Sequence, residues 1–334
     1  GRAAAGYPDI YFSSRSSGGG AWAADERVNA LSAVSASVVL SRPSVAAVTD
    51  GSSIDHIYVA WASETVGFYN ILTADRTSGG SWDNEVSPDA YLQSVTGWSD
   101  AQSVTSIGVD AAGNAYILWA DWLTSGDPSK PDLKVSYRAV GETDWGSPTT
   151  INDASFRVWG SPDLAEGADG TAFAAWMDDR PDAYHDIFFS RRGLVNGWTP
   201  NSQVNDDPGA VEQFVPAVAV DATGNAYVVW SDNRDAIYPA EDDQDIFFAL
   251  RSYTGIWGSN VRVNDDASQD NIQTSPAIAV SSDGDAYAVW ADNRDDWQGD
   301  IYFSFRDHTT GTWSTNIKIN DDAGDASQDN PAIV

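Results

Sequence analysis

The sequence predicts an all-β fold: a six-bladed β-propeller of four-stranded antiparallel blades, with the last blade built from both chain termini. A four-strand unit recurs along the chain, and the two ends carry pieces of one more unit. The composition agrees, because the 49 acidic residues comprise 42 Asp and 7 Glu. Asp favours turns and caps, whereas Glu favours helix interiors, so this bias argues against a helical protein.

The repeat is clearest at tryptophan. One Trp ends the second strand of each unit, and a second Trp follows a turn of small residues before "VND" or a relative of it. A period of 54 to 60 residues, without any sustained helical periodicity, is typical of propeller blades. The first set is Trp61, Trp119, Trp176, Trp230 and Trp290, and the second is Trp22, Trp82, Trp145, Trp198, Trp257 and Trp313.

Each unit predicts four short strands, A to D, joined by hairpin-sized links in which Gly, Asn and Asp supply positive φ. In one unit, strand A is "SPAIAV" (275–280), strand B is "DAYAVW" (285–290) and strand C is "DIYFSFR" (300–306). Strand D begins near the second Trp. Five complete units are expected within a single propeller domain spanning 1–334, at 36–92, 100–154, 157–207, 211–266 and 271–322.

The sixth blade is expected to combine residues 1–31, as strands C and D, with residues 327–334, as strand A. No copy of strand B exists for it. Residues 2–6 could replace that strand poorly, another molecule could supply it, or the polypeptide could continue beyond Gly1 and Val334. An open sheet edge is a template for pairing with a further strand. The candidate assembly residues are Arg2, Ala3, Ala4, Ala5, Pro331, Ala332, Ile333 and Val334.

The segment "DIYFSSRSSGGGAW" (9–22), with "TSGGSW" (77–82) and "TTGTW" (309–313), resembles the degenerate Asp-box, or BNR, repeat of sialidase-like six-bladed propellers. The repeat also resembles units of large secreted or cell-surface proteins of bacteria and archaea. A sialidase resemblance implies three substrate-binding arginines, a Tyr nucleophile with a Glu partner, and an Asp acid/base. The sequence departs from that pattern, since Thr77 and Ser78 stand where the Asp-box carboxylate is expected and no unique set of arginines occurs.

A repeated "DNRD" corner follows strand B in three successive units. Symmetric copies indicate a task that every blade shares, whereas catalysis needs different groups converging on one substrate. We therefore interpret the corner as structural, with Arg binding a carboxylate or carbonyls of the adjacent "NDD" loop and tying one blade to the next. A repeated sugar pocket beside Trp and a catalytic site are the alternatives. The corner residues are Asp179, Arg180, Asn233, Arg234, Asn293 and Arg294.

The net charge of −31, with only three Lys, makes nucleic acid an unexpected partner. Oxygen-rich loops suit Ca²⁺, although no EF-hand spacing is present and such residues also form ordinary turns. No other cofactor is expected. The absence of Cys excludes disulfides and thiolate metal sites, and no apolar run reaches the ~20 residues of a membrane span. The possible Ca²⁺ ligands are Asp206, Asp207, Asp265, Asp266, Asp321 and Asp322.

These observations predict a non-enzymatic propeller on the outside of a prokaryotic cell or at its surface. Its expected role is that of a structural, self-assembling subunit, such as part of a filament, tube or sheath, joined through the terminal blade to other copies of itself. The alternatives are a glycan-binding propeller and a divergent sialidase-like glycoside hydrolase. Catalysis is not expected because no catalytic constellation can be identified.

Overall fold

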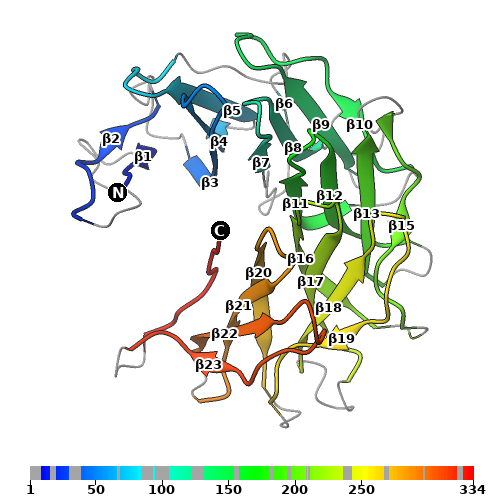
Figure 1. Ribbon diagram of the computed structural model, residues 1–334. Helices are drawn as coiled ribbons and strands as arrows, with labels where there is room; N and C mark the ends of the chain where they lie inside the picture. Colours follow the sequence, from blue (N-terminus) through cyan, green and yellow to red (C-terminus); the bar gives the residue numbers. More distant parts are fainter. Residues whose placement is uncertain are drawn as a thin grey trace. The chain divides into compact units, whose positions relative to one another are not determined.

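The chain folds into β-strands and turns, in two compact units formed by residues 1–150 and 151–334 (Figure 1). Among the described residues there is no helix of the length and apolarity needed to cross a membrane. The computed structural model describes residues 9–15, 20–29, 39–65, 68–83, 93–94, 105–121, 131–153, 158–180, 184–193, 197–207, 209, 211–235, 243–266, 271–295, 298–321 and 326–334.

The first unit holds one small sheet and two four-stranded antiparallel sheets, which we call blades. In each blade, consecutive strands are neighbours, as expected for an A-B-C-D meander. The small sheet pairs β1 (Tyr11–Phe12) with β2 (Glu26–Arg27). The blades are β3 (Val39–Thr49), β4 (Asp55–Thr65), β5 (Phe68–Thr77) and β6 (Gln93–Ser94), and β7 (Thr105–Val109), β8 (Ala115–Asp121), β9 (Asp132–Arg138) and β10 (Thr149–Thr150).

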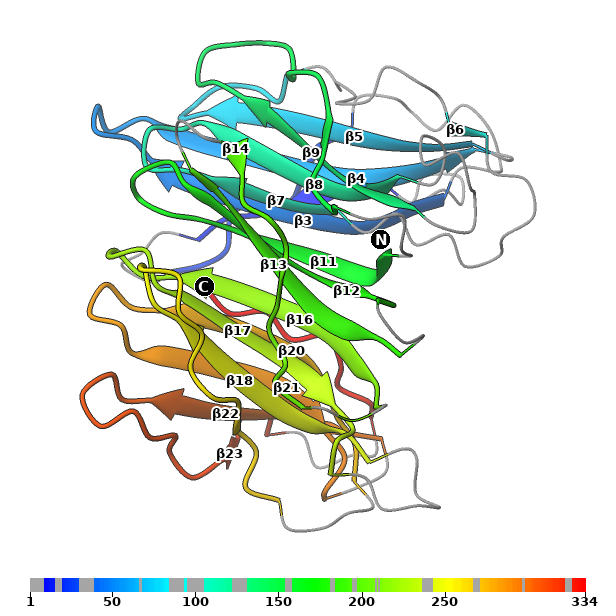
Figure 2. The same cartoon turned by 90° about the vertical axis from the view of Figure 1, so that its right-hand side faces the viewer.

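The second unit holds three blades, and Figure 2 shows their sheets stacked in chain order. In every blade the outermost strand is only two residues long, which leaves little sheet edge open to other chains. The strands are β11 (Val158–Glu166), β12 (Ala172–Asp178), β13 (Asp186–Gly193), β14 (Gly197–Trp198) and β15 (Ser202–Gln203); β16 (Gln213–Val220), β17 (Ala226–Asp232), β18 (Asp245–Arg251) and β19 (Val261–Arg262); and β20 (Gln273–Val280), β21 (Ala286–Asp292), β22 (Asp300–Arg306) and β23 (Ile317–Lys318).

The strand register is the same in successive blades of this unit. The last residue of strand B pairs with the first residue of strand C, as in Asp232 opposite Asp245. Strand A carries a bulge near its start, where the pairing of β16 shifts between Phe214 and Ala217. Pro216 has no N–H for the ladder and Val215 has a φ of 46°, so the bulge accommodates a residue pair that a regular strand does not.

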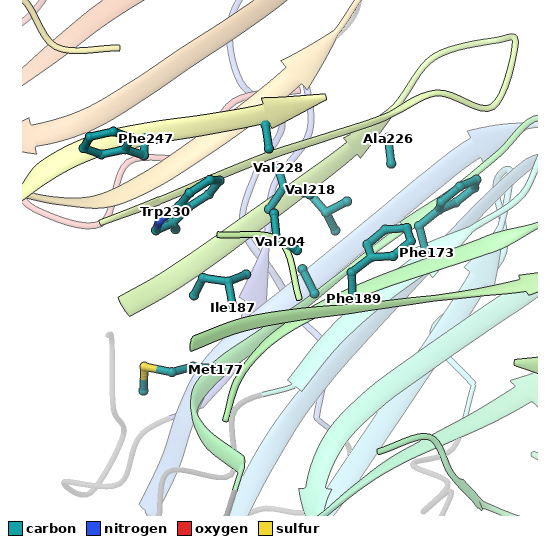
Figure 3. Packing of buried hydrophobic residues seen from close by; sticks show 12 residues of the cluster. Phe173, Met177, Ile187, Phe189, Val204, Val218, Ala226, Val228, Trp230 and Phe247 are labelled. Carbon is teal, nitrogen blue, oxygen red and sulfur yellow. The ribbon is translucent and has the colours of Figure 1, made fainter. Parts of the chain in front are cut away.

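The core lies between neighbouring blades. All seven residues of β17 are buried, so both faces of this strand are covered and its sequence is nearly all apolar rather than alternating. Figure 3 shows one face, where Trp230 and Val228 of β17 lie in one cluster with Phe189 and Ile187 of β13. The five strand-B tryptophans are the largest fully buried side chains among the described residues: Trp61, Trp119, Trp176, Trp230 and Trp290.

The second tryptophan of a unit packs against the preceding blade. The ring of Trp257 stands edge-on to Phe189 of β13, with centroids 5.1 Å apart and an interplanar angle of 86°. The guanidinium of Arg251 lies 5.2 Å from the centroid of the same Phe189 ring. Trp313 and Arg306 hold Phe248 of the preceding blade in the same way. These aromatic and cation–π contacts join adjacent blades at their outer strands.

The prediction of six blades is wrong in number, because the described residues form five blade sheets, four of them four-stranded and one, β11–β15, with five strands. Strands β1 and β2 form a two-stranded sheet, and residues 326–334 belong to no strand in the described part of the chain. The physical reason lies in the blade topology, in which strands A and C both pair with strand B. The sequence holds five B strands, so a strand-C segment and a strand-A segment alone do not complete a further blade.

Candidate functional site

Three strands of the second unit end on a carboxylate that is removed from water. Asp178, Asp232 and Asp292 are the last residues of β12, β17 and β21, and each is at most 1% exposed. In each case the indole Nε1 of the tryptophan two residues earlier donates to the carboxylate, at 3.3, 2.8 and 2.9 Å. The backbone N–H of the arginine two residues later also donates to it. A buried carboxylate requires such partners.

The arginine of the corner bridges two blades, as Arg234 illustrates. Its Nη2 lies 2.6 Å from Asp232 Oδ2 in its own blade and 3.0 Å from Asn260 Oδ1. Its Nη1 lies 2.9 Å from Oδ1 of Asp206, which follows the last strand of the preceding blade. The guanidinium carbon also sits 4.2 Å from the ring centroid of Phe247. One planar cation therefore satisfies carboxylates of two adjacent sheets.

The same geometry recurs at Arg180 and Arg294. Arg294 reaches Asp292 at 2.6 Å and Asp265 of the preceding blade at 2.8 Å, and Arg180 contacts Asp178 and Asp153. Burial opposes the charge of these arginines, but hydrogen bonds and attraction from the paired aspartates outweigh it and raise the pKa of all three. The cations are therefore permanent.

The asparagine inside the corner fastens the start of strand A. Asn233 Oδ1 accepts the backbone N–H of Glu212 at 2.7 Å, and the N–H of Asn233 donates to the Glu212 carbonyl at 3.1 Å. Asn293 makes the same pair of bonds with Ile272. In the third copy, Asp179 stands in place of Asn and lies 3.5 Å from Trp159 Nε1. These internal contacts favour the structural interpretation of the corner over a sugar pocket.

The carboxylates predicted as calcium ligands have protein partners. Asp206 and Asp265 each accept a guanidinium bond at one oxygen and a backbone N–H at the other. Asp207 lies near Arg234, and Asp266 accepts from Asn271. Asp321 is exposed, whereas Asp322 lies outside the described residues. Within the described part of the chain, no three acidic or His side chains are placed to hold a metal ion, so the calcium prediction gains no support.

The structure describes only some of the predicted assembly residues. Arg2, Ala3, Ala4 and Ala5 lie outside the described residues. Pro331, Ala332, Ile333 and Val334 are described and belong to no strand there.

One group with unusual chemistry was not identified from the sequence. Asp243 precedes β18 and is 3% exposed, and its Oδ1 has no hydrogen-bond partner among the residues that the structure describes. Burial, followed by the charge of neighbouring Asp245, raises the pKa of Asp243 to about 6. A carboxyl group with such a pKa holds or releases a proton near neutral pH, which is a property typical of functional sites. The sequence shows the acidic run 241–243 but not which member is buried.

Asp243 lies in a link whose length differs between the blades. The link between β17 and β18 covers residues 233–244, whereas the corresponding links cover only 179–185 and 293–299. The corner is common to all three blades, but this extension belongs to one. The longer link, which contains Asp243, is therefore a feature of one blade of the second unit.

Comparison with known proteins shows the fold. No family model matches the chain, and no curated protein matches it. A protein of unknown function from Dyadobacter fermentans has a TM-score of 0.53 and 10% identity, covering 86% of this chain and 89% of its own. The GH93 α-L-arabinofuranosidase of Fusarium graminearum has a TM-score of 0.54 and 9% identity, covering 87% and 83%. NanB sialidase from Streptococcus pneumoniae has a TM-score of 0.54 and 8% identity, covering 89% and 63%.

The chain is thus a β-propeller with four-stranded antiparallel blades, and the resemblance to sialidase-like propellers is confirmed at the level of fold. The prediction that it is not an enzyme is contradicted, because most of the similar structures are arabinofuranosidases, sialidases or a polysaccharide lyase. That prediction rested on features shared by all blades. Repeated residues report what holds a propeller together, whereas function depends on particular sites carried by the fold.

We expect Arg234→Gln to lower the free energy of unfolding by about 3–5 kcal/mol, because it leaves the buried Asp232 carboxylate without its cation. Urea denaturation followed by tryptophan fluorescence measures this loss. The matched control is Arg27→Gln, since Arg27 of β2 is exposed and is expected to contribute about 0–1 kcal/mol. Equal losses in the two variants would contradict a structural role for the corner.

We expect Asp243→Asn to stabilise the protein at pH 7.5 by roughly 3 kcal/mol, at about 1.4 kcal/mol per pKa unit. The folded-state pKa is raised, so the native protein binds the proton more tightly and loses stability as the pH rises from about 4 to about 6. Urea denaturation should show that the stability difference between Asp243→Asn and the wild type grows from pH 4.5 to 7.5, whereas the exposed control Asp283→Asn should follow the wild type. A difference between wild type and Asp243→Asn that does not change with pH would refute the assignment.

Proposed function

We propose that this chain is a carbohydrate-recognising β-propeller that works at the cell surface or outside the cell. The observation that carries the proposal is the fold it shares, over 87 to 89% of its length, with structures whose names specify an arabinofuranosidase, a polysaccharide lyase and a sialidase. Those three names have carbohydrate in common, although their chemistries differ. The proposal therefore names a ligand class and no single sugar or reaction.

The region around Asp243 supports this proposal with chemistry of its own. A buried carboxyl with one unpartnered oxygen can exchange a hydrogen bond with a sugar hydroxyl that enters its surroundings. It lies in the link between β17 and β18 that is longer than its counterparts, so it is a feature of one blade. Perturbed acids of this kind cluster at functional sites.

The test has a binding arm and a turnover arm. We expect the protein to bind a restricted group of sugars on a glycan array, and Asp243→Asn to weaken that binding about tenfold, the effect of losing one hydrogen bond to a charged group. Asp283→Asn serves as the control that should bind like the wild type. Because Asp243→Asn is expected to be the more stable protein, weaker binding cannot be attributed to unfolding. Binding to no glycan at all would oppose the proposal.

In the turnover arm, fluorogenic α-L-arabinofuranoside and sialoside substrates are incubated with the wild type. Release of the fluorophore that Asp243→Asn reduces would make this residue part of the reacting site. Binding without release would place the protein among the lectin-like propellers. If the wild type neither binds a glycan nor releases the fluorophore, carbohydrate recognition has no support.

A second candidate function is self-association as a structural subunit through the C-terminal segment. It is favoured by the segment 326–334, which ends with Pro331–Val334 and belongs to no strand among the described residues. We expect deletion of Ser327–Val334 to abolish assembly while leaving the blades folded. Sedimentation velocity measures assembly, and circular dichroism checks folding. Unchanged assembly of the folded truncated protein would exclude this segment as the connector.

A further inference from the structure

The segment Gln328–Val334 repeats the start of strand A. It has the sequence Gln-x-x-Pro-Ala, which also opens β16 at Gln213 and β20 at Gln273. The backbone conformation is repeated as well. The residue before the proline has a positive φ in each copy, 46° at Val215, 53° at Ser275 and 50° at Asn330. Positive φ is rare outside glycine, so its recurrence at this one position identifies Asn330 as part of the same bulge.

The contacts that hold this start are also repeated. The backbone N–H of Gln328 donates to Gly299 O at 3.2 Å, just as Gln273 donates to Gln244 O at 2.8 Å. The side-chain oxygen of Gln328 accepts from Asn320 at 3.2 Å. In the two preceding copies the corresponding asparagine-to-glutamine distances are 3.1 and 2.9 Å. Residues of the β20–β23 blade thus hold the segment in the strand-A conformation.

The three copies differ in whether a strand pairs with them. Strand β16 pairs with β17 and β20 pairs with β21 in the same register, from the first glutamine onward. The segment 328–334 pairs with no strand in the described part of the chain. Its backbone therefore presents the geometry of a sheet edge to which a strand can be added.

The preceding copies specify what that strand must carry. The residue before each first glutamine makes two hydrogen bonds with the corner asparagine. In one copy, the backbone N–H of Ile272 donates to Asn293 Oδ1, and the backbone N–H of Asn293 donates to the Ile272 carbonyl. Gln273 itself donates to Asp292 at 3.3 Å. The corner arginine then pairs with an aspartate after the preceding blade, Asp265 in that copy. The equivalent positions here are Ser327, Gln328 and Asp321, and Asp321 is exposed.

We infer that Asp321 and Ser327–Val334 form an acceptor site for an extended polypeptide strand of the B type, ending in Trp-x-Asp-Asn-Arg. The strand pairs with the backbone of 328–334, its asparagine bonds the backbone of Ser327, and its arginine pairs with the Asp321 carboxylate. This inference does not depend on carbohydrate recognition. It concerns the same C-terminal segment as the self-association candidate. Its test does not require the protein to associate with itself.

The test uses a fluorescein-labelled peptide with the sequence of residues 283–295, DGDAYAVWADNRD, and measures fluorescence anisotropy against the full chain. We expect saturable binding, and no binding of a scrambled peptide. A peptide with the arginine changed to Gln should bind about tenfold more weakly, because it loses a charge-assisted pair. Hydrogen exchange should show new protection of the amides in 329–334 when the first peptide binds.

A double-mutant cycle locates the site. In Asp321→Asn, the arginine and glutamine peptides should bind equally, whereas the matched variant Asp283→Asn should distinguish them tenfold as the wild type does. Deletion of Gln328–Val334 should abolish binding without loss of the circular dichroism spectrum. The inference is overturned if Asp321→Asn still distinguishes the peptides, or if the truncated protein binds as tightly as the full chain. A failure of self-association in sedimentation experiments affects neither outcome.

Discussion

The joint between neighbouring blades of the second unit depends on one buried ion pair. A strand covered on both faces brings its last residue into a place without water, and in β17 that residue is an aspartate. The guanidinium of Arg234 lies 2.6 Å from the buried carboxylate of Asp232 and provides the partner that a buried carboxylate requires. The same guanidinium also donates to Asp206 of the preceding blade. The group that pairs with the carboxylate of one blade therefore also joins that blade to the next. Apolar packing around Trp230 completes the joint.

This joint explains why the most conspicuous motif of the chain says little about its activity. The Nη groups of Arg234 and Arg294 donate to aspartates within the protein, so these groups are already occupied by structural contacts. What distinguishes one blade from another is the long link that precedes β18, where Asp243 is held without a full set of partners. An energetic cost of this kind is expected where a site serves a ligand rather than the fold.

The C-terminal segment shows that strand conformation and strand pairing are separate properties. The bonds of Gln328 are made to the blade that precedes the segment, and the positive φ at Asn330 occurs although no described strand pairs with it. The ladder beyond Pro331 requires a second strand, which the described residues do not provide. An edge that already has its conformation loses less entropy when a strand is added than a disordered segment does.

The sequence by itself determined the all-β class, the antiparallel A-B-C-D order and the five complete units, because each follows from local patterns that recur with a fixed period. The sequence also identified the DNRD corner and the tryptophans as repeated features. Tertiary structure alone decided the partners of Arg234 and the burial of Asp243. These depend on pairing and packing between residues far apart in the chain, and the residue type of Asp243 is the same as that of exposed aspartates such as Asp235. Whether a carboxyl is solvated or enclosed is a property of its surroundings, which no local pattern specifies.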